Sequence, residues 1–307
     1  MNPTKTPTTA SRLRAVLQHA TSASAVVESF QPVGGGCISD AYRVAVGGVQ
    51  GGVAEWFVKC GGPEMERNYR CEAKGLAALR EASRSIAGLT VPEPVAVGAI
   101  DGNAYLILPF LSVHRGHVDG AQLGRCLAQL HQATRSKRVG WHETNFLGAS
   151  EQINAPEDHW PRFVRDYRIE PQVRWAIAGG HLSDSQAEMF WRLLEKLPQW
   201  FDDDAATSLL HGDLWSGNVL KLTDGRIALI DPAVYYGTPE AEWGMMRLFG
   251  GFGASCESAY HTVIPKTDDW DIRVDVFVLY HLLNHLNLFG GGYREPCLSL
   301  CRRLMSV

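Results

Sequence analysis

Apolar side chains alternate with a period of two in the first third of the chain. The segment AYRVAV, residues 41–46, alternates directly after a glycine-rich turn, and EWFVKC, residues 55–60, is a second short β-rich run. VPEPVAVGAI and AYLILPFLS predict two further strands on either side of the turn signal DGN. Residues 65–83 carry apolar and small side chains at helical spacing. The pattern predicts a small sheet with one helix.

Helical periodicity takes over from about residue 112 and is interrupted by LLHGDLWSGNVL and IALIDPAVYY. The predicted helices read GAQLGRCLAQLHQATRS, HWPRFVRDYRIEPQVRWAIAG, SDSQAEMFWRLLEKLPQWF, EAEWGMMRLFG and WDIRVDVFVLYHLLNHLNLFG. We therefore expect an α+β, bilobal fold, which the length of 307 residues also favours. Residues 1–111 would form an N-lobe with an antiparallel sheet, and residues 112–307 a larger, mainly helical C-lobe. The boundary is predicted near residues 108–112.

Composition narrows the class of partner. The chain is 45% hydrophobic and 20% charged, which is typical of a soluble globular protein. Its net charge of −4 indicates no general attraction to nucleic acid or to an anionic membrane. The most apolar stretch, VFVLYHLLNHLNLFG, is interrupted by two His and two Asn and is too short to span a bilayer. We expect a small partner, with no nucleic acid and no membrane, and either a monomer or a homodimer.

The N-terminus and the cysteines bear on the cellular compartment. The first 27 residues include Lys5, Arg12 and Arg14, many Ser and Thr and no acid, which is the composition of a transit peptide. An ordinary helix over SRLRAVLQHA is the favoured alternative. Seven cysteines without a CxxC pair predict neither a disulfide framework nor a zinc site. We expect a cytoplasmic protein, with organellar import as the alternative.

Four polar residues lie within the two apolar stretches that interrupt the helices. His211, Asp213 and Asn218 occur in LLHGDLWSGNVL, and Asp231 follows thirteen residues after Asn218. One interpretation is a turn between strands in which Asp and Asn cap backbone groups. The other is a cation site with a proton acceptor, because Mg²⁺ binds a few hard oxygen ligands together with water and phosphate. The spacing favours the second interpretation.

Three upstream features complete a set of six parts in the order of a protein-kinase-like phosphotransfer site. They are the glycine turn Gly34, Gly35 and Gly36, the strand residue Lys59 and the helix residue Glu72. The glycines would let backbone N–H groups approach phosphate oxygens. Lys59 would bind the phosphates and Glu72 would hold it in place. Alone, each feature has an ordinary structural explanation, and their order makes the set informative.

The remaining three parts would carry the chemistry. Asp213 would accept or orient the hydrogen of a substrate hydroxyl, while Asn218 and Asp231 would hold Mg²⁺. Protein kinases read H-R-D-L-x-x-x-N and then D-F-G, whereas this chain reads HGDLWSGN and DPA and has no APE segment. Regulation by an activation loop is therefore not expected, and a small-molecule kinase is favoured.

The chain resembles the fructosamine-3-kinase (ketosamine-3-kinase) family, an aminoglycoside-phosphotransferase-like branch of the protein-kinase-like superfamily. The resemblance extends from about residue 30 to the C-terminus and rests on GGGCIS, FVK, HGDLWSGN, IDPAVYYG, LFGGFGASCESAYHTVIPK and NHLNLFGGGYR. It implies a protein-kinase-like fold and ATP-dependent phosphorylation of the 3-hydroxyl of a ketosamine, a fructosamine or ribulosamine that is free or on a protein lysine. The product would eliminate its phosphate and return the amine, which amounts to deglycation.

The resemblance also implies residue roles. Asp213 would be the catalytic residue, Asn218 and Asp231 the Mg²⁺ ligands, and Lys59 and Glu72 the pair that anchors the phosphates of ATP. Backbone around Leu108 to Phe110 would hold the adenine.

Three further residues are candidates for function. Trp215 could stack on the sugar or contact a protonated amine, although packing of the loop is an equal alternative. His285, on an apolar helix with His281 one turn earlier, is proposed as a substrate contact because of the resemblance at NHLNLFG. Cys37 follows the glycine turn, where backbone amides would stabilise a thiolate, so its oxidation would inhibit the enzyme. An unreactive small residue in a tight loop is the alternative for Cys37.

Three other functions compete with the ketosamine kinase. An aminoglycoside- or choline-type kinase typically needs an acidic cluster, for which the chain offers only scattered residues such as Asp202 to Asp204. A nucleotide-binding pseudoenzyme scaffold is disfavoured because the catalytic set is complete. A metal-dependent phosphohydrolase using His211 and Asp213 lacks a second His/Asp pair at ligand spacing.

Overall fold

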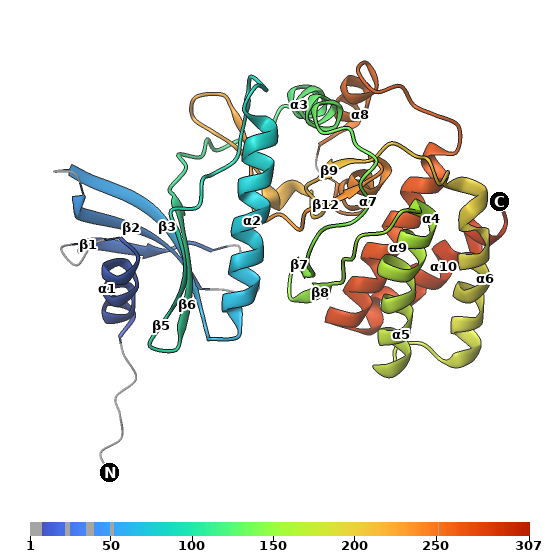
Figure 1. Cartoon of the computed structure of the whole chain (residues 1–307), viewed down its shortest axis with the longest axis horizontal. Coiled ribbons are helices and arrows are strands. Elements are labelled where there is room, and N and C mark those ends of the chain that lie inside the picture. The colour runs from blue at the N-terminus through green and yellow to red at the C-terminus, as the bar shows by residue number, and fades with distance from the viewer. Residues whose placement is uncertain (1–7, 22–24, 35–39, 50–51, 251) are drawn as a thin grey trace, which may run out of the picture.

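The computed structural model describes residues 8–21, 25–34, 40–49, 52–250 and 252–307. It has a twisted sheet at one end and a group of helices at the other (Figure 1). Helix α2, Met65–Ser83, lies between the two parts, with one side toward the sheet. The α+β fold predicted from the periodicity is confirmed. The division at residues 111 and 112 stays a prediction.

The sheet has five strands in the order β1-β2-β3-β6-β5, and all neighbouring pairs are antiparallel. The strands are β1 Val26–Pro32, β2 Asp40–Val49, β3 Gly52–Gly61, β5 Ala96–Ile100 and β6 Asn103–Pro109. Lys59 lies opposite Ala41 on one side and Leu106 on the other. The central position of β3 therefore fixes Lys59 within the sheet.

Helix α1, Thr9–Ala20, packs against this sheet and closes a small core. Thr8 caps its N-terminus by accepting a hydrogen bond from the N–H of Ser11. Leu13, Val16 and Leu17 are fully buried among the apolar residues of β2, β3 and β6. The helix alternative for this segment is therefore confirmed, and these residues are part of the fold.

The second part of the chain is mainly helical. Its helices are α3 Gly120–Ala133, α4 Trp160–Phe163, the π-helix Val164–Ile169, α5 Glu170–Ala178, α6 Asp184–Trp200, α7 Glu240–Phe249, α8 Ala254–His261, α9 Trp270–Phe289 and α10 Arg294–Met305. Two 3₁₀ turns, Ser216–Asn218 and Gly291–Tyr293, complete the set. Helix α9 is buried along most of its length and forms the centre of this core.

Short strands precede the two segments that carry the predicted catalytic and metal-binding residues. β10 Val219–Lys221 and β11 Ile227–Leu229 form an antiparallel pair that also joins β4 Leu89–Thr90. β9 Ser208–Leu210 pairs with β12 Tyr235–Gly237, and β7 Asn145–Leu147 pairs with β8 Ser150–Gln152. The HGD segment follows β9 and Asp231 follows β11, so both are held close to strand ends.

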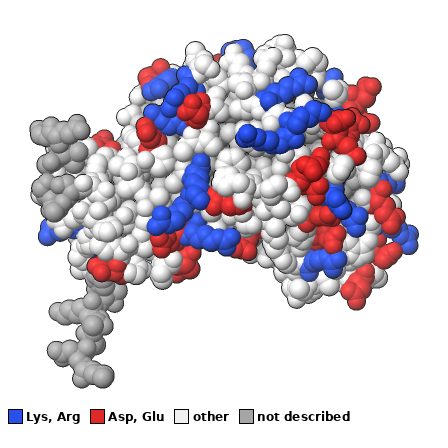
Figure 2. All heavy atoms as spheres, viewed as in Figure 1, with Lys and Arg blue, Asp and Glu red and all other residues white. Residues whose placement is uncertain are grey.

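The charged surface agrees with the small net charge. On the face in Figure 2, Lys and Arg atoms lie beside Asp and Glu atoms rather than in one continuous stripe. Arg247 and Lys266 both pair with Asp271, for example, and Arg303 pairs with Asp275. Within the described ranges, no helix combines the length and the apolar character that crossing a bilayer needs.

Candidate active site

The HGD turn is built around a glycine that no other residue could replace without strain. Gly212 has a φ of +81°, and a Cβ added there would lie 2.1 Å from the carbonyl oxygen of Ala233. This close approach brings the turn against the segment that follows Asp231. The N–H of Ala233 also donates to the carbonyl of His211 at 2.8 Å.

His211 connects the two acidic segments through both ring nitrogens. Nε2 lies 2.8 Å from the carbonyl of Ile230, so it carries the hydrogen, and Nδ1 accepts the N–H of Asp213 at 3.3 Å. Burial lowers the pKa of His211, against the opposing effect of Glu242, and favours this neutral form. Because both nitrogens are occupied by backbone groups, His211 has a structural part in the site and the phosphohydrolase alternative is further disfavoured.

Asp213 and Asn218 form the second half of the site. The amide Nδ2 of Asn218 donates to the carbonyl oxygen of Asp213 at 2.8 Å and to its Oδ2 at 3.2 Å. The Oδ1 of Asp213 is buried and has no hydrogen-bond partner among the described residues. Burial, and then the charge of Asp231, raises the pKa of Asp213 to about 7. The site thus contains a carboxyl oxygen without a protein partner.

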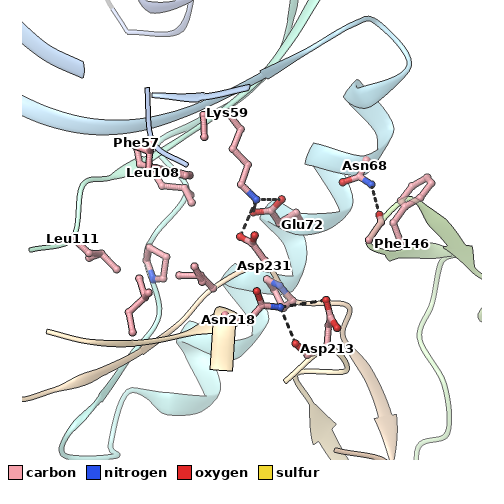
Figure 3. A pocket seen from close by; sticks show the side chains of 18 of the residues that line it. Phe57, Lys59, Asn68, Glu72, Leu108, Leu111, Phe146, Asp213, Asn218 and Asp231 are labelled. Atoms are coloured by element: carbon pink, nitrogen blue, oxygen red, sulfur yellow. Dashed lines mark hydrogen bonds and ion pairs between the residues drawn. The ribbon is translucent and has the colours of Figure 1, made fainter. Parts of the chain in front are cut away.

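Lys59 lies between two carboxylates. Its Nζ is 2.8 and 2.9 Å from the two oxygens of Glu72 on α2 and 2.8 Å from Oδ1 of Asp231 (Figure 3). Burial lowers the pKa of Lys59, but the charges of Glu72 and Asp231 outweigh burial and hold the pKa above its ordinary value. Lys59 is therefore charged, and it joins the sheet, α2 and the segment after β11.

Asp231 has an unusual backbone conformation. Its φ of +56° is in the left-handed region, which asparagine and aspartate tolerate better than most residues. Strain of this kind persists where surrounding contacts enforce it, and such positions cluster at functional sites. The side chain is thereby turned toward Lys59.

A cavity of about 420 Å³ joins these residues. One end is apolar and is lined by Phe57, Leu108 and Leu111; Asn68 and Phe146 lie at the opposite end (Figure 3). Gly34, the one glycine of the predicted turn that is described, also lines the cavity, as do Pro109 and Phe110. Gly35, Gly36 and Cys37 lie outside the described residues, so the oxidation hypothesis stays a prediction. The cavity has the size of a nucleotide or small-molecule site.

The predicted adenine segment lies at the apolar end of the cavity. Leu108 and Phe110 both line it, but the N–H of Phe110 donates to the carbonyl of Glu55 at 3.0 Å. An adenine contact would therefore fall to the remaining backbone groups of this segment. The guanidinium of Arg43 lies over the ring of Phe110, 4.5 Å from the ring centroid.

The two predicted substrate residues belong to one group of aromatic rings. Trp215 lines the cavity, and its ring packs over Gly217, where a Cβ would lie 2.4 Å from it. The ring of Phe249 lies 6.2 Å from that of Trp215 and 4.7 Å from that of His285. Burial lowers the pKa of His285, and its Nδ1 lies 2.8 Å from the carbonyl of His281. Nε2 is then the hydrogen-bond acceptor of a neutral ring.

Glu242 is a residue of this site that the sequence did not identify. It lies in the first turn of α7, where an acidic side chain is ordinarily explained as a helix N-terminal charge. Its carboxylate also accepts the backbone N–H of His211 at 2.6 Å and of Gly212 at 3.1 Å, and the side chain is buried. A pattern of acids in a first turn does not reveal a contact with a loop 31 residues away.

The residues expected to bind a metal offer few ligands. Nδ2 of Asn218 donates to Asp213, so Asn218 could offer a metal ion only its Oδ1. The carboxylate of Asp231, which accepts from Lys59, is the second possible ligand. Among the described residues, no group of three or more His, Cys, Asp and Glu side chains is arranged to hold a metal ion. Two hard oxygen ligands fit Mg²⁺, which commonly binds one or two protein groups together with phosphate and water.

Comparisons with known proteins point to one family of kinases. The family described as fructosamine kinase matches residues 9–306. A probable ketoamine kinase of Synechocystis is 35% identical over 284 residues, 92% of each chain. A chloroplastic protein-ribulosamine 3-kinase of Oryza sativa is 36% identical over 280 residues, 89% of this chain and 78% of its own.

Solved structures show the same fold. A Thermobifida fusca protein assigned as a fructosamine-3-kinase has a TM-score of 0.81 at 27% identity, covering 96% of this chain and 99% of its own. An amicoumacin kinase in complex with AMP-PNP and Ca²⁺ has a TM-score of 0.56 at 17% identity over 96% of this chain and 95% of its own, which shows the fold alone. The predicted resemblance and kinase-like fold are confirmed, and the chain belongs to the fructosamine kinase family.

Proposed function

We propose that this protein transfers the γ-phosphoryl group of ATP to the 3-hydroxyl of a ketosamine. The observation that carries the proposal is the buried Oδ1 of Asp213, which has no hydrogen-bond partner among the described residues and lies at a cavity shared with the Lys59–Asp231 ion pair. The names of two relatives, probable ketoamine kinase and protein-ribulosamine 3-kinase, support the substrate class. The product would lose its phosphate by elimination and release the amine.

The polar half of the cavity suits the ATP phosphates. Lys59 would bind the α- and β-phosphate oxygens, and Glu72 would keep its ammonium in place while Asp231 turned to a metal ion. Asn218 Oδ1 and the Asp231 carboxylate would hold Mg²⁺. When bound, Mg²⁺ neutralises charge on the phosphates. The apolar end, with Phe57 and Leu108, suits the adenine.

Asp213 would act on the acceptor hydroxyl. Its free Oδ1 is the natural acceptor for the hydroxyl hydrogen, and Asn218 fixes the other oxygen through a hydrogen bond at 3.2 Å. Phosphoryl transfer has a loose transition state, so orienting the hydroxyl matters more than a strong base. The ionised carboxylate is the competent form.

Trp215 and His285 would contact the ketosamine. The ring of Phe249 lies near both of them, and Trp215 lines the cavity. An indole face can stack on the C–H surface of a sugar or attract the protonated amine, and Nε2 of a neutral His285 can accept a hydrogen bond. Both roles are proposals that the substitutions Trp215→Ala and His285→Ala would test through the KM for the ketosamine.

A reducing compartment, the cytoplasm or an organelle, is proposed for the protein. The six cysteines in the described part of the chain are all free and buried. Fractionation of cells that express the tagged full chain would distinguish the two locations.

The test is an ADP-release assay with Mg²⁺ and ATP on four acceptors: ribuloselysine, fructoselysine, kanamycin and choline. We expect turnover on the ketosamines alone, lost in Asp213→Asn and retained in Asp224→Asn, which changes an exposed aspartate that pairs with Arg226. Turnover on kanamycin or choline alone would reject the substrate. No turnover on any acceptor would favour the nucleotide-binding scaffold.

A further inference from the structure

The β7–β8 hairpin hydrogen-bonds to the main chain that follows Asp231. Nδ2 of Asn145 donates to the carbonyl of Val234 at 2.8 Å, and Nε2 of Gln152 donates to the carbonyl of Ala233 at 2.9 Å. Both amide side chains are buried, with 3% and 2% exposure. The hairpin therefore fixes the backbone carbonyls of the residues two and three positions after Asp231 through buried hydrogen bonds.

Other buried groups fix the orientation of both amides. Oδ1 of Asn145 accepts from Gln152 and from Asn154, each at 2.9 Å. Oε1 of Gln152 accepts from the hydroxyl of Tyr280 on α9 at 3.1 Å, and Oδ1 of Asn154 accepts from the guanidinium of Arg168 at 2.7 Å. With their oxygens so occupied, the two amides present their NH₂ groups to the carbonyls after Asp231.

The hairpin and the two residues just before it, Glu143 and Thr144, contact α2, the helix that carries Glu72. Nδ2 of Asn68 donates to the carbonyl of Gly148 at 3.2 Å, and Nζ of Lys74 lies 2.7 Å from Oε2 of Glu143 (Figure 3 shows the first contact). Sγ of Cys71 donates to the carbonyl of Thr144 at 3.6 Å, and Arg67 lies over the ring of Phe146. These contacts occur on both sides of Glu72 in the sequence.

Helix α2 also packs on the segment that follows Asp231. A Cβ at Gly75 would lie 3.2 Å from Pro232 and 3.4 Å from Val234, so the helix contacts the residues that follow Asp231. One hairpin thus contacts both structures that supply a carboxylate to Lys59: α2 with Glu72, and the segment with Asp231 (Figure 1).

We propose that the β7–β8 hairpin is the positioning element of the phosphotransfer site, with Asn145 and Gln152 as positioning residues that set Asp231 and, through α2, Glu72. In protein kinases, activation-loop phosphorylation and movement of the equivalent helix control the Lys–Glu pair. Here the hairpin holds the pair permanently in place. The inference rests on the proposed function, because Lys59 and Asp231 are taken as phosphate and metal ligands.

Asn145→Asp tests the inner contact with little change in shape. A carboxylate oxygen would replace the NH₂ group and face the carbonyl of Val234, which shifts the segment after Asp231. We expect kcat to fall tenfold or more, because small misplacements of reacting groups reduce rates strongly, while the KM for the ketosamine changes less than twofold. The wild-type protein is measured in the same assay, so absence of the activity itself is recognised separately.

Gln172→Glu is the matched control. Gln172 is also a buried amide, but its side-chain hydrogen bonds are to Asn284 and Asn287 rather than to the hairpin or the segment after Asp231. Both variants are compared at a temperature at which their melting curves show folded protein. We expect the control to keep kcat within twofold. A kcat within twofold of wild type for Asn145→Asp, or an equal loss in the control, would overturn the proposal.

The outer contact gives a second test on the protein surface, where substitutions leave folding intact. Lys74→Glu places like charges beside Glu143, and we expect the KM for ATP to rise at least threefold because α2 and Glu72 lose their support. Adding Glu143→Lys restores the opposite charges and should return the KM to within twofold of wild type. An unchanged KM in Lys74→Glu, or no recovery in the double variant, would refute the proposed support of α2 by the segment that leads into the hairpin.

Discussion

Glu242→Gln is expected to impair catalysis although Glu242 lies behind the catalytic loop. Its carboxylate accepts two backbone N–H groups, those of His211 and Gly212, which lie two residues and one residue before Asp213. The substituted amide keeps one oxygen and presents an NH₂ group to the other N–H. One buried donor is then unsatisfied and repelled, so the turn that carries Asp213 must move.

The size of the effect follows from the geometry. A hydrogen bond to a charged group is worth about 1.5–3 kcal/mol, and an unsatisfied buried donor costs about 1–3 kcal/mol. We therefore expect the free energy of unfolding to fall by about 2–4 kcal/mol in Glu242→Gln. A shift of about 1 Å in a reacting group can reduce the rate roughly a hundredfold. We expect kcat to fall by roughly ten- to a hundredfold.

Steady-state ADP release and urea unfolding of the same preparations measure the two effects. Glu240→Gln is the matched control, because Glu240 is buried two residues earlier in α7 and pairs with Arg273 at 2.7 Å rather than with the loop. It should lose stability and keep kcat. A normal kcat in Glu242→Gln, or an equal loss of kcat in Glu240→Gln, would refute this reasoning.

Four further predictions concern residues of the site. Because the pKa of Asp213 is raised to about 7, the acidic limb of kcat/KM for ATP should lie near pH 7, with activity lost as the carboxylate is protonated at lower pH. The same raised pKa means that ionisation of Asp213 destabilises the folded state as pH rises toward 7. Asp213→Asn should therefore abolish turnover and yet stabilise the nucleotide-free protein at pH 8, by up to about 4 kcal/mol and nearer to about 2 kcal/mol because the side chain is partly exposed. Urea unfolding should show no gain in stability at pH 4. Gly212→Ala should cost at least about 1–2 kcal/mol from its backbone conformation alone, seen as a lower melting temperature, and an unchanged value would contradict the positive φ. Glu72→Gln should lower kcat/KM for ATP at least about tenfold, the scale of one charged hydrogen bond, and a normal value would remove Glu72 from phosphate anchoring.

Long periodic segments were predictable from the sequence. Helix α2 was predicted over residues 65–83 and is observed as Met65–Ser83, because helical spacing continues over its whole length and glycines and a proline precede it. Helix α10, Arg294–Met305, was missed: Pro296 obscures a helix start that tolerates proline in its first turn. Helix α8, with eight residues between a glycine and Thr262, is too short to give a clear period.

Some residues of the site could be predicted from the sequence and others could not. The order of Lys59, Glu72 and Asp231 allowed their convergence to be predicted, although Lys59 and Asp231 are 172 residues apart. Asn145 and Gln152 could not be identified, because strands of three residues have no measurable period and these inward side chains are polar where a core strand predicts apolar ones. Their partners are backbone carbonyls, which leave no trace in a sequence.

The central claim is that Asp213 directs a phosphoryl group to the 3-hydroxyl of a ketosamine. The most direct measurement is ³¹P and ¹H NMR of the reaction of wild type and Asp213→Asn with ATP, Mg²⁺ and ribuloselysine or fructoselysine. Our account predicts a phosphomonoester coupled to the hydrogen on C3, followed by the appearance of free lysine, and neither signal with the variant. Phosphate on another carbon, release of inorganic phosphate without an ester, or an equal product yield with Asp213→Asn would contradict it.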